Sequence, residues 1–576
     1  MYAEEVIDDD TSHDISGDDW IMQYDFKMPI EYTKARALDT QVKSDIEFQG
    51  KDNLFSILLD PATPSLLLNK WSTIYTTDTS FLKDNQKLLK SYEPMKNKMH
   101  LFAKEYVSFK QEQNFLGKYQ YIQFRRLFFL NTIVGFLQIL ALYNICSPLF
   151  TLLSPFIGLI LPYFVLYFKG ITIGFGDYLK MIKAIIFKNK IIHNLLNFRG
   201  NSIQQNIYTL GYLFIYGMGI YSNIQSCIQF YKNTNYMMDF NTNYGQFLDD
   251  GNHLIHYIHN KTKHFKSFDA FNVQMMKHQT SIQKMSIAIA SLKQEQRKFM
   301  KCGNIGLLMK CHFDLFYNTE YNDTILYLIY LNQYHQDTFQ LSTFVKNRQL
   351  MPCTFSKKKG NTKIKQMYYL PHIHDDNVKN DIHFNKNIII TGPNASGKTT
   401  IIKSTIMNLF LSQSLGFGCY QKCKTKVYHY FHSYLNIPDT SNRDSLFQAE
   451  ARRCKTIFEH IQKHKSQNHL CIFDEIYSGT NPKDAVLCAN IYLNGMNHHK
   501  HHVDYVLTTH YLELCDKFKK HSHVKNQQMK VNTTSENDAI SYTYLLEDGI
   551  SHVHGGYQIL EKMDYPEELL ERNNIR

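Results

Sequence analysis

The stretch Ile388-Ile-Ile-Thr-Gly-Pro-Asn-Ala-Ser-Gly-Lys-Thr-Thr400 decides the fold of the C-terminal part of the chain. Three isoleucines lead into the pattern G-x-x-x-x-G-K-T, and a helix-compatible run follows up to residue 410. This order predicts a buried strand, a phosphate-binding loop and the first turn of a helix. Glycines let such a loop adopt backbone angles that other residues resist, so that its N–H groups can surround phosphates. The sequence therefore predicts a nucleoside triphosphate site.

The residues of this loop have expected parts in the site. Lys398 is expected to be catalytic because it reaches the β- and γ-phosphates, and the Thr399 hydroxyl is expected to ligate Mg²⁺. ATP and Mg²⁺ are the cofactors that follow from this pattern. The full set of predicted ATP-binding residues is Gly392, Pro393, Asn394, Ala395, Ser396, Gly397, Lys398, Thr399 and Thr400.

Two further apolar segments end in polar residues suited to ATP hydrolysis. Residues 469–476 read His-Leu-Cys-Ile-Phe-Asp-Glu-Ile. Asp474 is expected to hold Mg²⁺ through water, and Glu475 to act as a catalytic residue that polarises the attacking water. Residues 503–510 form another predicted strand, which ends on His510, a catalytic candidate placed to sense the γ-phosphate. Buried strands that alternate with helices predict an α/β P-loop ATPase domain with a mainly parallel sheet.

Charge is unevenly distributed along the chain. The 576 residues carry a net charge of +11, but the first twenty contain eight acidic side chains and no Lys or Arg. We expect residues 1–45 to be an acidic, disordered tail, since they have neither the basic nor the apolar region of a signal peptide. The remainder carries about +19, which favours an anionic partner, either a membrane surface or nucleic acid. The eleven scattered cysteines indicate reduced thiols.

An uncharged, mostly apolar run extends from position 127 to position 168. About 20 apolar residues span a bilayer as a helix, so the run predicts two spans, 127–144 and 149–168, joined by a turn. Basic residues flank both ends, which places the ATPase domain in the cytosol by the positive-inside rule. A buried helical pair in a soluble core is the alternative. A second uncharged stretch, 207–228, is either a third span or a core helix.

The remaining segments have helical patterning, so a mostly α-helical region with a transmembrane hairpin is expected to precede the ATPase domain. The expected parts are an acidic tail at 1–45, a helical segment at 46–125, the transmembrane hairpin at 126–170, a helical clamp-like region at 171–350 and the ATPase domain at 351–576.

Four motifs together resemble one protein family. They are T-G-P-N-x-x-G-K-T-T at 391–400, S-L-F-Q-A-E at 445–450, F-D-E-I-Y-S-G-T-N-P at 473–482 and T-T-H-Y-L-E-L at 508–514. In this order they are similar to the MutS family of DNA mismatch repair ATPases, within the ABC-type superfamily. The resemblance implies a homodimer of ATPase domains in which a signature segment of one chain closes the nucleotide of the other. Here that segment would be Ser445, Phe447 and Glu450.

The chain departs from a full mismatch repair protein in several ways. It is shorter, and its first 120 residues contain no F-x-E motif of the kind with which the family recognises mismatches. With its membrane-type run at 127–168, it looks more like short membrane-anchored MutS-like ATPases. The resemblance implies a multi-pass, membrane-anchored, ATP-driven dimer that acts on duplex DNA. The alternative is a nucleotide-gated membrane scaffold or remodelling ATPase that does not bind DNA.

Overall fold

The computed structural model describes residues 21, 23–61, 65–171, 173–188, 202–296, 304–356, 361–375, 377–435, 446–533 and 540–553. The chain divides into two compact units. One comprises Asp25–Lys96, Leu254–Lys277 and Tyr330–Arg576, and we call it the nucleotide unit. The other, the helical unit, comprises Met1–Tyr24, Asn97–His253 and His278–Ile329.

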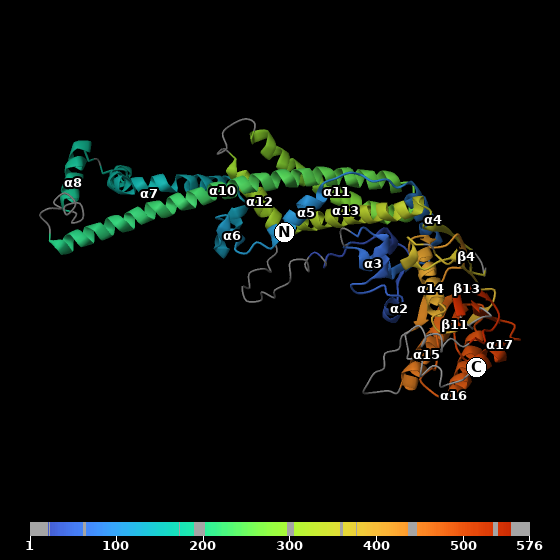
Figure 1. Cartoon of the computed structure of the whole chain (residues 1–576). Helices are drawn as coiled ribbons and strands as arrows, with labels where there is room; N and C mark the ends of the chain where they lie inside the picture. Colours follow the sequence, from blue (N-terminus) through green and yellow to red (C-terminus); the bar gives the residue numbers. More distant parts are fainter. Residues whose placement is uncertain are drawn as a thin grey trace. The chain divides into compact units, whose positions relative to one another are not determined.

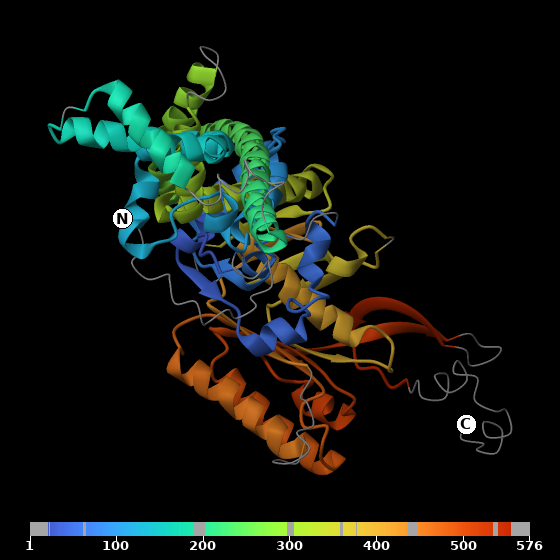
Figure 2. The ribbon, with the colours of Figure 1, turned by 90° about the vertical axis from the view of Figure 1, so that its left-hand side faces the viewer.

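A six-stranded sheet in the order β13-β12-β6-β11-β10-β9 forms the centre of the nucleotide unit (Figure 1). Its five parallel strands are β6 (Asn387–Thr391), β9 (Tyr430–Tyr434), β10 (His469–Asp474), β11 (Val503–Thr508) and β12 (Val524–Thr533). The last strand, β13 (Ile540–Asp548), is antiparallel to β12, and the two form a hairpin at one edge of the sheet (Figure 2). The predicted mainly parallel α/β domain is therefore confirmed.

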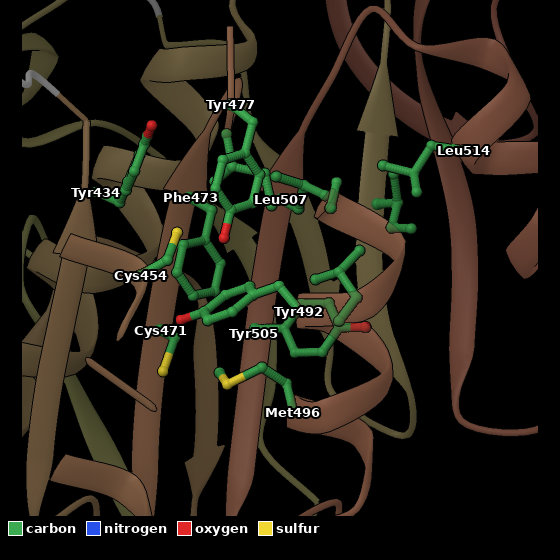
Figure 3. Packing of buried hydrophobic residues seen from close by; sticks show 14 of the residues in the cluster. Tyr434, Cys454, Cys471, Phe473, Tyr477, Tyr492, Met496, Tyr505, Leu507 and Leu514 are labelled. Carbon is green, nitrogen blue, oxygen red and sulfur yellow. The ribbon is translucent and has the colours of Figure 1, made fainter. Parts of the chain in front are cut away.

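Helices cover both faces of this sheet. One face packs against α15 (Leu446–Lys463), α16 (Pro482–Asn497) and α17 (Leu512–Phe518) through a cluster of buried apolar side chains (Figure 3). Phe473 and Tyr505 of neighbouring strands lie in that cluster, 6.3 Å apart between ring centroids. The other face packs against α14 (Lys398–Ser414), which follows the loop after β6 and is buried along most of its length.

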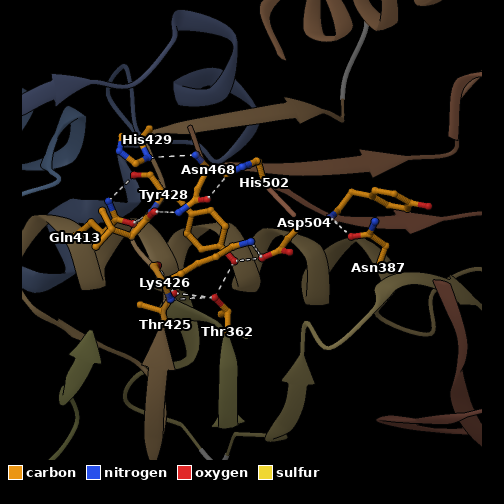
Figure 4. A network of polar contacts seen from close by, with 12 residues as sticks. Thr362, Asn387, Gln413, Thr425, Lys426, Tyr428, His429, Asn468, His502 and Asp504 are labelled. Carbon is orange, nitrogen blue, oxygen red and sulfur yellow. Dashed lines mark hydrogen bonds and ion pairs between the residues drawn. The ribbon is translucent and has the colours of Figure 1, made fainter. Parts of the chain in front are cut away.

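A second sheet, in the order β5-β4-β8-β3-β7, lies on the far side of α14. Its strands are β3 (Met351–Phe355), β4 (Lys363–Met367), β5 (Asn380–His383), β7 (Phe417–Gly418) and β8 (Lys422–Thr425). A buried polar network joins the segment after β8 to the main sheet (Figure 4). The Lys426 ammonium lies 2.9 Å from the Asp504 carboxylate, and the Tyr428 hydroxyl donates to the same carboxylate. Burial raises the pKa of Asp504, and Lys426 opposes that rise.

Residues 25–96 also fold onto the nucleotide unit. They contain η1 (Pro29–Tyr32), β1 (Ala35–Ala37), α2 (Thr40–Asp45), η2 (Leu54–Leu58), α3 (Leu68–Thr73), β2 (Ile74–Thr76) and α4 (Thr79–Ser91). The buried Asp45 carboxylate accepts hydrogen bonds from the Ser433 hydroxyl and the Leu435 amide of the main sheet. A disordered tail reaching residue 45 is thus wrong for its second half, because these residues have partners far along the chain. Residues 1–20 lie outside the described residues.

The helical unit is built around aromatic side chains. Its elements are α5 (Met99–Lys110), α6 (Phe115–Lys118), η3 (Arg125–Thr132), α7 (Val134–Phe168), α8 (Phe175–Lys188), α12 (Ile305–Tyr317) and parts of three longer helices. Those three, α10 (Ile203–Thr262), α11 (Asp269–Gln296) and α13 (Thr319–Lys346), also contribute residues to the nucleotide unit, together with η4 (Lys266–Phe268). Phe115 stacks on Phe316 at 4.0 Å between centroids, and Phe109 packs on Phe240 at 4.6 Å.

The predicted turn at residues 144–148 is wrong, because α7 runs through it as one helix of 35 residues. Pro148 has no N–H to donate to the carbonyl of Asn144, four residues before it. The Ser147 hydroxyl donates to that carbonyl instead, at 3.0 Å. Pro155 leaves the carbonyl of Thr151 without its helical donor in the same way, and two hydroxyl groups, Ser154 at 2.8 Å and Tyr216 at 3.1 Å, donate to it.

One helical segment of the described residues is long and apolar enough to cross a membrane: Val134–Ser154, 21 residues with a mean hydropathy of 1.7. The hairpin that the sequence predicted within 127–168 is therefore replaced by a single helix. The stretch 207–228 belongs to α10, which lies antiparallel beside α7 (Figure 1). The Asn223 amide donates to the Thr151 hydroxyl, and the Cys227 thiol approaches the Ile145 carbonyl.

Candidate nucleotide site

The loop between β6 and α14 has the backbone that the sequence pattern requires. Gly397, which caps α14, has a φ of +94°, in the left-handed region that side chains disfavour. At Gly392 a Cβ atom would lie 2.9 Å from the Cβ of Met529, so the adjacent strand β12 leaves room only for glycine. The Ser396 hydroxyl donates to the Pro393 carbonyl at 2.7 Å and closes the loop on itself. Both glycines are therefore needed for this loop shape.

The side chain of Lys398 extends along the loop. Its ammonium donates to the carbonyls of Gly392 at 3.0 Å and Pro393 at 3.2 Å, and it lies 3.1 Å from Nε2 of His510. Burial lowers the pKa of Lys398, while the nearby carboxylates of Glu475 and Asp474 oppose that shift. A positive charge is thus held among backbone carbonyls at the start of a helix, where phosphate groups would bind.

The predicted magnesium residues meet at the end of β10. The Thr399 hydroxyl donates to Oδ2 of Asp474 at 2.8 Å, and the Thr508 hydroxyl donates to Oδ1 of the same carboxylate. Hydroxyl and carboxylate oxygens are the hard ligands that Mg²⁺ prefers, with water and phosphate completing its shell. The donor set therefore fits this ion, and Thr399 and Asp474 are the residues that would hold it.

The two predicted catalytic residues Glu475 and His510 are in direct contact. Nε2 of His510 lies 2.8 Å from Oε1 of Glu475. Glu475 has a φ of 50°, and its amide donates to the Thr508 carbonyl at 3.1 Å, which fixes the turn at the end of β10. The hydrogen bond from His510 is the main cause of a lowered pKa for Glu475. Glu475 is therefore held ionised, as a base that polarises water must be.

The loop opens onto a cavity of about 680 Å³, a size typical of small-molecule sites. Its other wall contains Tyr369, His372, Val378 and Tyr544, which the sequence did not single out. The Asn380 side chain exchanges hydrogen bonds with the backbone of β13, donating to the Tyr544 carbonyl and accepting from the Leu546 amide. This bridge brings Tyr544 over the phosphate loop. The alternating polar and apolar residues of 540–548, typical of a strand, were the signal in the sequence that could have indicated this aromatic wall.

The signature segment differs from its expected role. Ser445 lies outside the described residues. Phe447 packs on the apolar cluster of the main sheet, with its ring 5.9 Å from that of Tyr477. Glu450 is 2% exposed, and its carboxylate accepts hydrogen bonds from the Ser478 amide at 3.1 Å, the Ser478 hydroxyl at 3.0 Å and the Gly479 amide at 3.1 Å. The expectation that Glu450 reaches a partner's nucleotide therefore needs correction, because its own chain occupies the carboxylate.

Residues 388–575 match the family model described as MutS domain V. This C-terminal segment belongs to the MutS family. The chain is 27% identical over 202 residues to the DNA mismatch repair protein MutS of Geobacillus sp. (strain WCH70), a match that covers 34% of this chain and 22% of that protein. It is 28% identical over 196 residues to the endonuclease MutS2 of Lactococcus lactis subsp. cremoris (strain MG1363), covering 34% and 24% respectively.

The chain thus matches less than a quarter of the length of these two relatives. MutS domain V is an ATPase-type α/β domain. The phosphate loop and the parallel strands of the main sheet agree with this description. The predicted MutS resemblance is confirmed for this domain. At this level the comparison supports ATP binding and hydrolysis by residues 388–575.

Proposed function

We propose that this protein is a Mg²⁺-dependent ATPase of the MutS type. The observation that carries the proposal is the meeting of three predicted elements at the carboxyl ends of adjacent parallel strands. These are the phosphate loop with Lys398, the Thr399–Asp474 pair and the Glu475–His510 pair. In this arrangement Lys398 binds the phosphates, Asp474 and Thr399 hold the metal ion, and Glu475 orients water toward the γ-phosphate.

We also propose that two copies of the nucleotide unit pair during the ATP cycle. Helix α16 follows the loop 477–481 that Glu450 holds in place, and it carries two exposed apolar side chains. Leu487 is 54% exposed and Ile491 is 63% exposed, and a spacing of four residues places them on one face of the helix. This apolar strip beside the loop 477–481 is a surface that a second copy would cover. The resemblance of the four motifs to the MutS family implies a dimer of this kind.

The helical unit supports anchoring in a membrane. The uncharged stretches of α7 and α10 lie side by side, and their apolar side chains point outward: Ile139 is 68% exposed, Phe214 69% and Ile215 71%. Exposed apolar surface of this extent is typical of an interaction with lipid or with another protein. The 21 residues of Val134–Ser154 span about 30 Å as a helix, the thickness of a bilayer core. Helix α10 lies beside this segment and would share its contact with the bilayer.

We propose duplex DNA as the partner, because the relatives are a DNA mismatch repair protein and an endonuclease MutS2. The charge of about +19 beyond residue 20 would favour binding to phosphates. The second candidate is an ATP-gated membrane scaffold or remodelling ATPase without DNA. The exposed apolar face of α7 and α10 favours this candidate.

The test is ATP turnover by the full chain in detergent, measured alone and with homoduplex, mismatched or branched DNA. Stimulation by DNA, together with an affinity that falls steeply with salt, supports the DNA-acting ATPase. Turnover that no DNA changes, with no salt-dependent binding, supports the scaffold or remodelling function. Lys398→Ala serves as the control, because it should abolish nucleotide binding and all turnover.

Membrane anchoring has its own test in liposome flotation. Ile215→Glu places a charge on the exposed apolar face of α10 and should reduce co-flotation with vesicles. Ile287→Glu is a matched control, since Ile287 is also 71% exposed but lies on α11, outside the uncharged stretches. Equal flotation of both variants would contradict the proposed membrane contact.

A further inference from the structure

Three histidines gather at the edge of the main sheet, away from the phosphate loop. His432 lies on β9, His469 is the first residue of β10, and His460 lies on α15 above these strands. One ring nitrogen from each lies within 4.8 Å of the other two. His432 and His469 are buried. All three belong to the nucleotide unit.

The hydrogen bonds around His469 fix the tautomer of its ring. Its Nε2 lies 3.1 Å from the carbonyl of His464 and must be protonated to donate to it. Its Nδ1 then carries a lone pair and accepts a hydrogen bond from Nε2 of His432 at 3.1 Å, which a bound metal ion would replace. Two imidazole nitrogens bound to one tetrahedral Zn²⁺ at ~2.05 Å lie roughly 3.3 Å apart, close to this separation.

The third histidine completes the cluster. Nδ1 of His460 is buried and has no hydrogen-bond partner among the described residues. Such an atom is costly to bury unless an ion, a proton or water satisfies it. The ring of Tyr430 packs 4.5 Å from that of His460 and 5.1 Å from that of His469, and so fixes both rings. The ring of His464 lies 4.8 Å from that of His460 between centroids.

The electrostatic surroundings keep these histidines neutral. Burial is the main cause of the lowered pKa of each, and the neighbouring histidines add to it. The pKa of His469 falls to about 4. Arg453 acts in the same direction on His432, and Lys463 does so on His460.

We propose that His432, His460 and His469 form a binding site for a transition metal ion of the Zn²⁺ class, with the fourth position open to water or His464. Three imidazoles and no carboxylate suit Zn²⁺ and similar ions rather than Mg²⁺, so the site is chemically distinct from the nucleotide site. The ion would tie α15 to β9 and β10. Because α15 also carries Phe447 and Glu450, the metal would stiffen the helix that positions the signature segment.

The experiment uses the full chain in detergent, treated with chelator and then titrated with Co²⁺ and Zn²⁺ without ATP. We expect one equivalent of Co²⁺ per chain with the intense visible absorption of a tetrahedral site, and a higher Tm with Zn²⁺. His460→Ala should weaken binding at least tenfold and remove the Tm increase. His498→Ala is the matched control, because this exposed histidine lies in a separate histidine-rich loop; it should bind as the wild type does.

Three results would overturn the proposal. One is a wild-type protein that takes up no Co²⁺ or shows only the weak spectrum of octahedral coordination. Another is His460→Ala with unchanged affinity, and the third is loss of binding in His498→Ala. The Co²⁺ spectrum of the wild type tests the site without any substitution, so a variant that fails to fold does not remove the test. Nucleotide binding should persist in His460→Ala, which separates failure of this site from failure of the ATPase proposal.

Discussion

Replacing Glu450 tests whether the signature helix acts within its own chain. The carboxylate is 2% exposed and accepts three hydrogen bonds from Ser478 and Gly479. In Glu450→Ala the two backbone N–H groups lose their acceptor, although Ser478 and Gly479 are themselves exposed. Hydrogen bonds to a charged group contribute about 1.5–3 kcal/mol each. Since water can partly replace the acceptor, we expect a loss of about 3 kcal/mol of unfolding free energy.

The assay is thermal unfolding of the full chain in detergent without nucleotide, followed by calorimetry. At an unfolding entropy of about 2.1 cal/mol/K per residue, a loss of about 3 kcal/mol corresponds to a fall in Tm of roughly 4 °C for a unit of the size of the nucleotide unit. Glu450→Gln keeps one acceptor oxygen and should lose about half as much. Glu459→Ala is the matched control, because Glu459 lies on the same helix with its side chain 62% exposed; its effect should stay within about 0.5 kcal/mol.

An unchanged Tm in Glu450→Ala, combined with lost ATP turnover, would refute this reasoning. That outcome would mean that the carboxylate acts on a nucleotide, in its own chain or in a partner, and that the three hydrogen bonds contribute nothing to the fold.

Two other changes probe the contacts that shape the nucleotide unit. Lys426→Met leaves the buried Asp504 without its cationic partner, although Tyr428 still donates to it, and should cost about 3–5 kcal/mol in chemical denaturation. Because burial raises the folded pKa of Asp504, that cost should shrink as the pH falls and the carboxyl is protonated; a pH-independent cost would contradict the assignment. In Gly479→Ala the new methyl group would lie 2.7 Å from Leu446, so Tm should fall by an overpacking cost of about 1–3 kcal/mol. Leu446→Ala in the same chain should restore part of it, and a purely additive double variant would argue against this contact.

The core of the nucleotide unit follows from local patterns in the sequence. Short apolar runs ending in Gly392, Asp474 and His510 predict buried parallel strands, and the carboxyl ends of such strands share one edge of the sheet. This property of parallel sheets predicts that the site residues lie close together, and the prediction needs no information about contacts between distant parts of the chain. The Thr399–Asp474 and Glu475–His510 contacts are found as that reasoning requires.

The features that the sequence missed depend on partners far along the chain. The turn predicted before Pro148 is absent because a serine hydroxyl satisfies the carbonyl that proline leaves free, and because α10 packs beside α7. Residues 23–45 are folded, and Asp45 is bonded to a strand residue 388 positions later. Tyr544 reaches the phosphate loop through its bridge to Asn380. Such contacts between distant residues leave no periodic pattern in the local sequence, so they could not be predicted from it.

The role of Glu450 could not be read from its motif either. A glutamate in that position can point toward a partner or into its own chain, and the sequence is the same in both cases. Only the position of residues 478–479, which follow β10, decides between them.

The most direct test of the proposed ATPase compares ATP binding and turnover in the wild type and in Glu475→Gln, both in detergent with Mg²⁺. Glutamine fits the same space but cannot act as a base, so ATP affinity should stay within about threefold while turnover falls by roughly 10²-fold or more. The ATP-bound variant should also accumulate as a dimer, whereas Lys398→Ala should bind no nucleotide. Turnover in Glu475→Gln within about tenfold of the wild type would contradict the assignment of Glu475 as the residue that activates water.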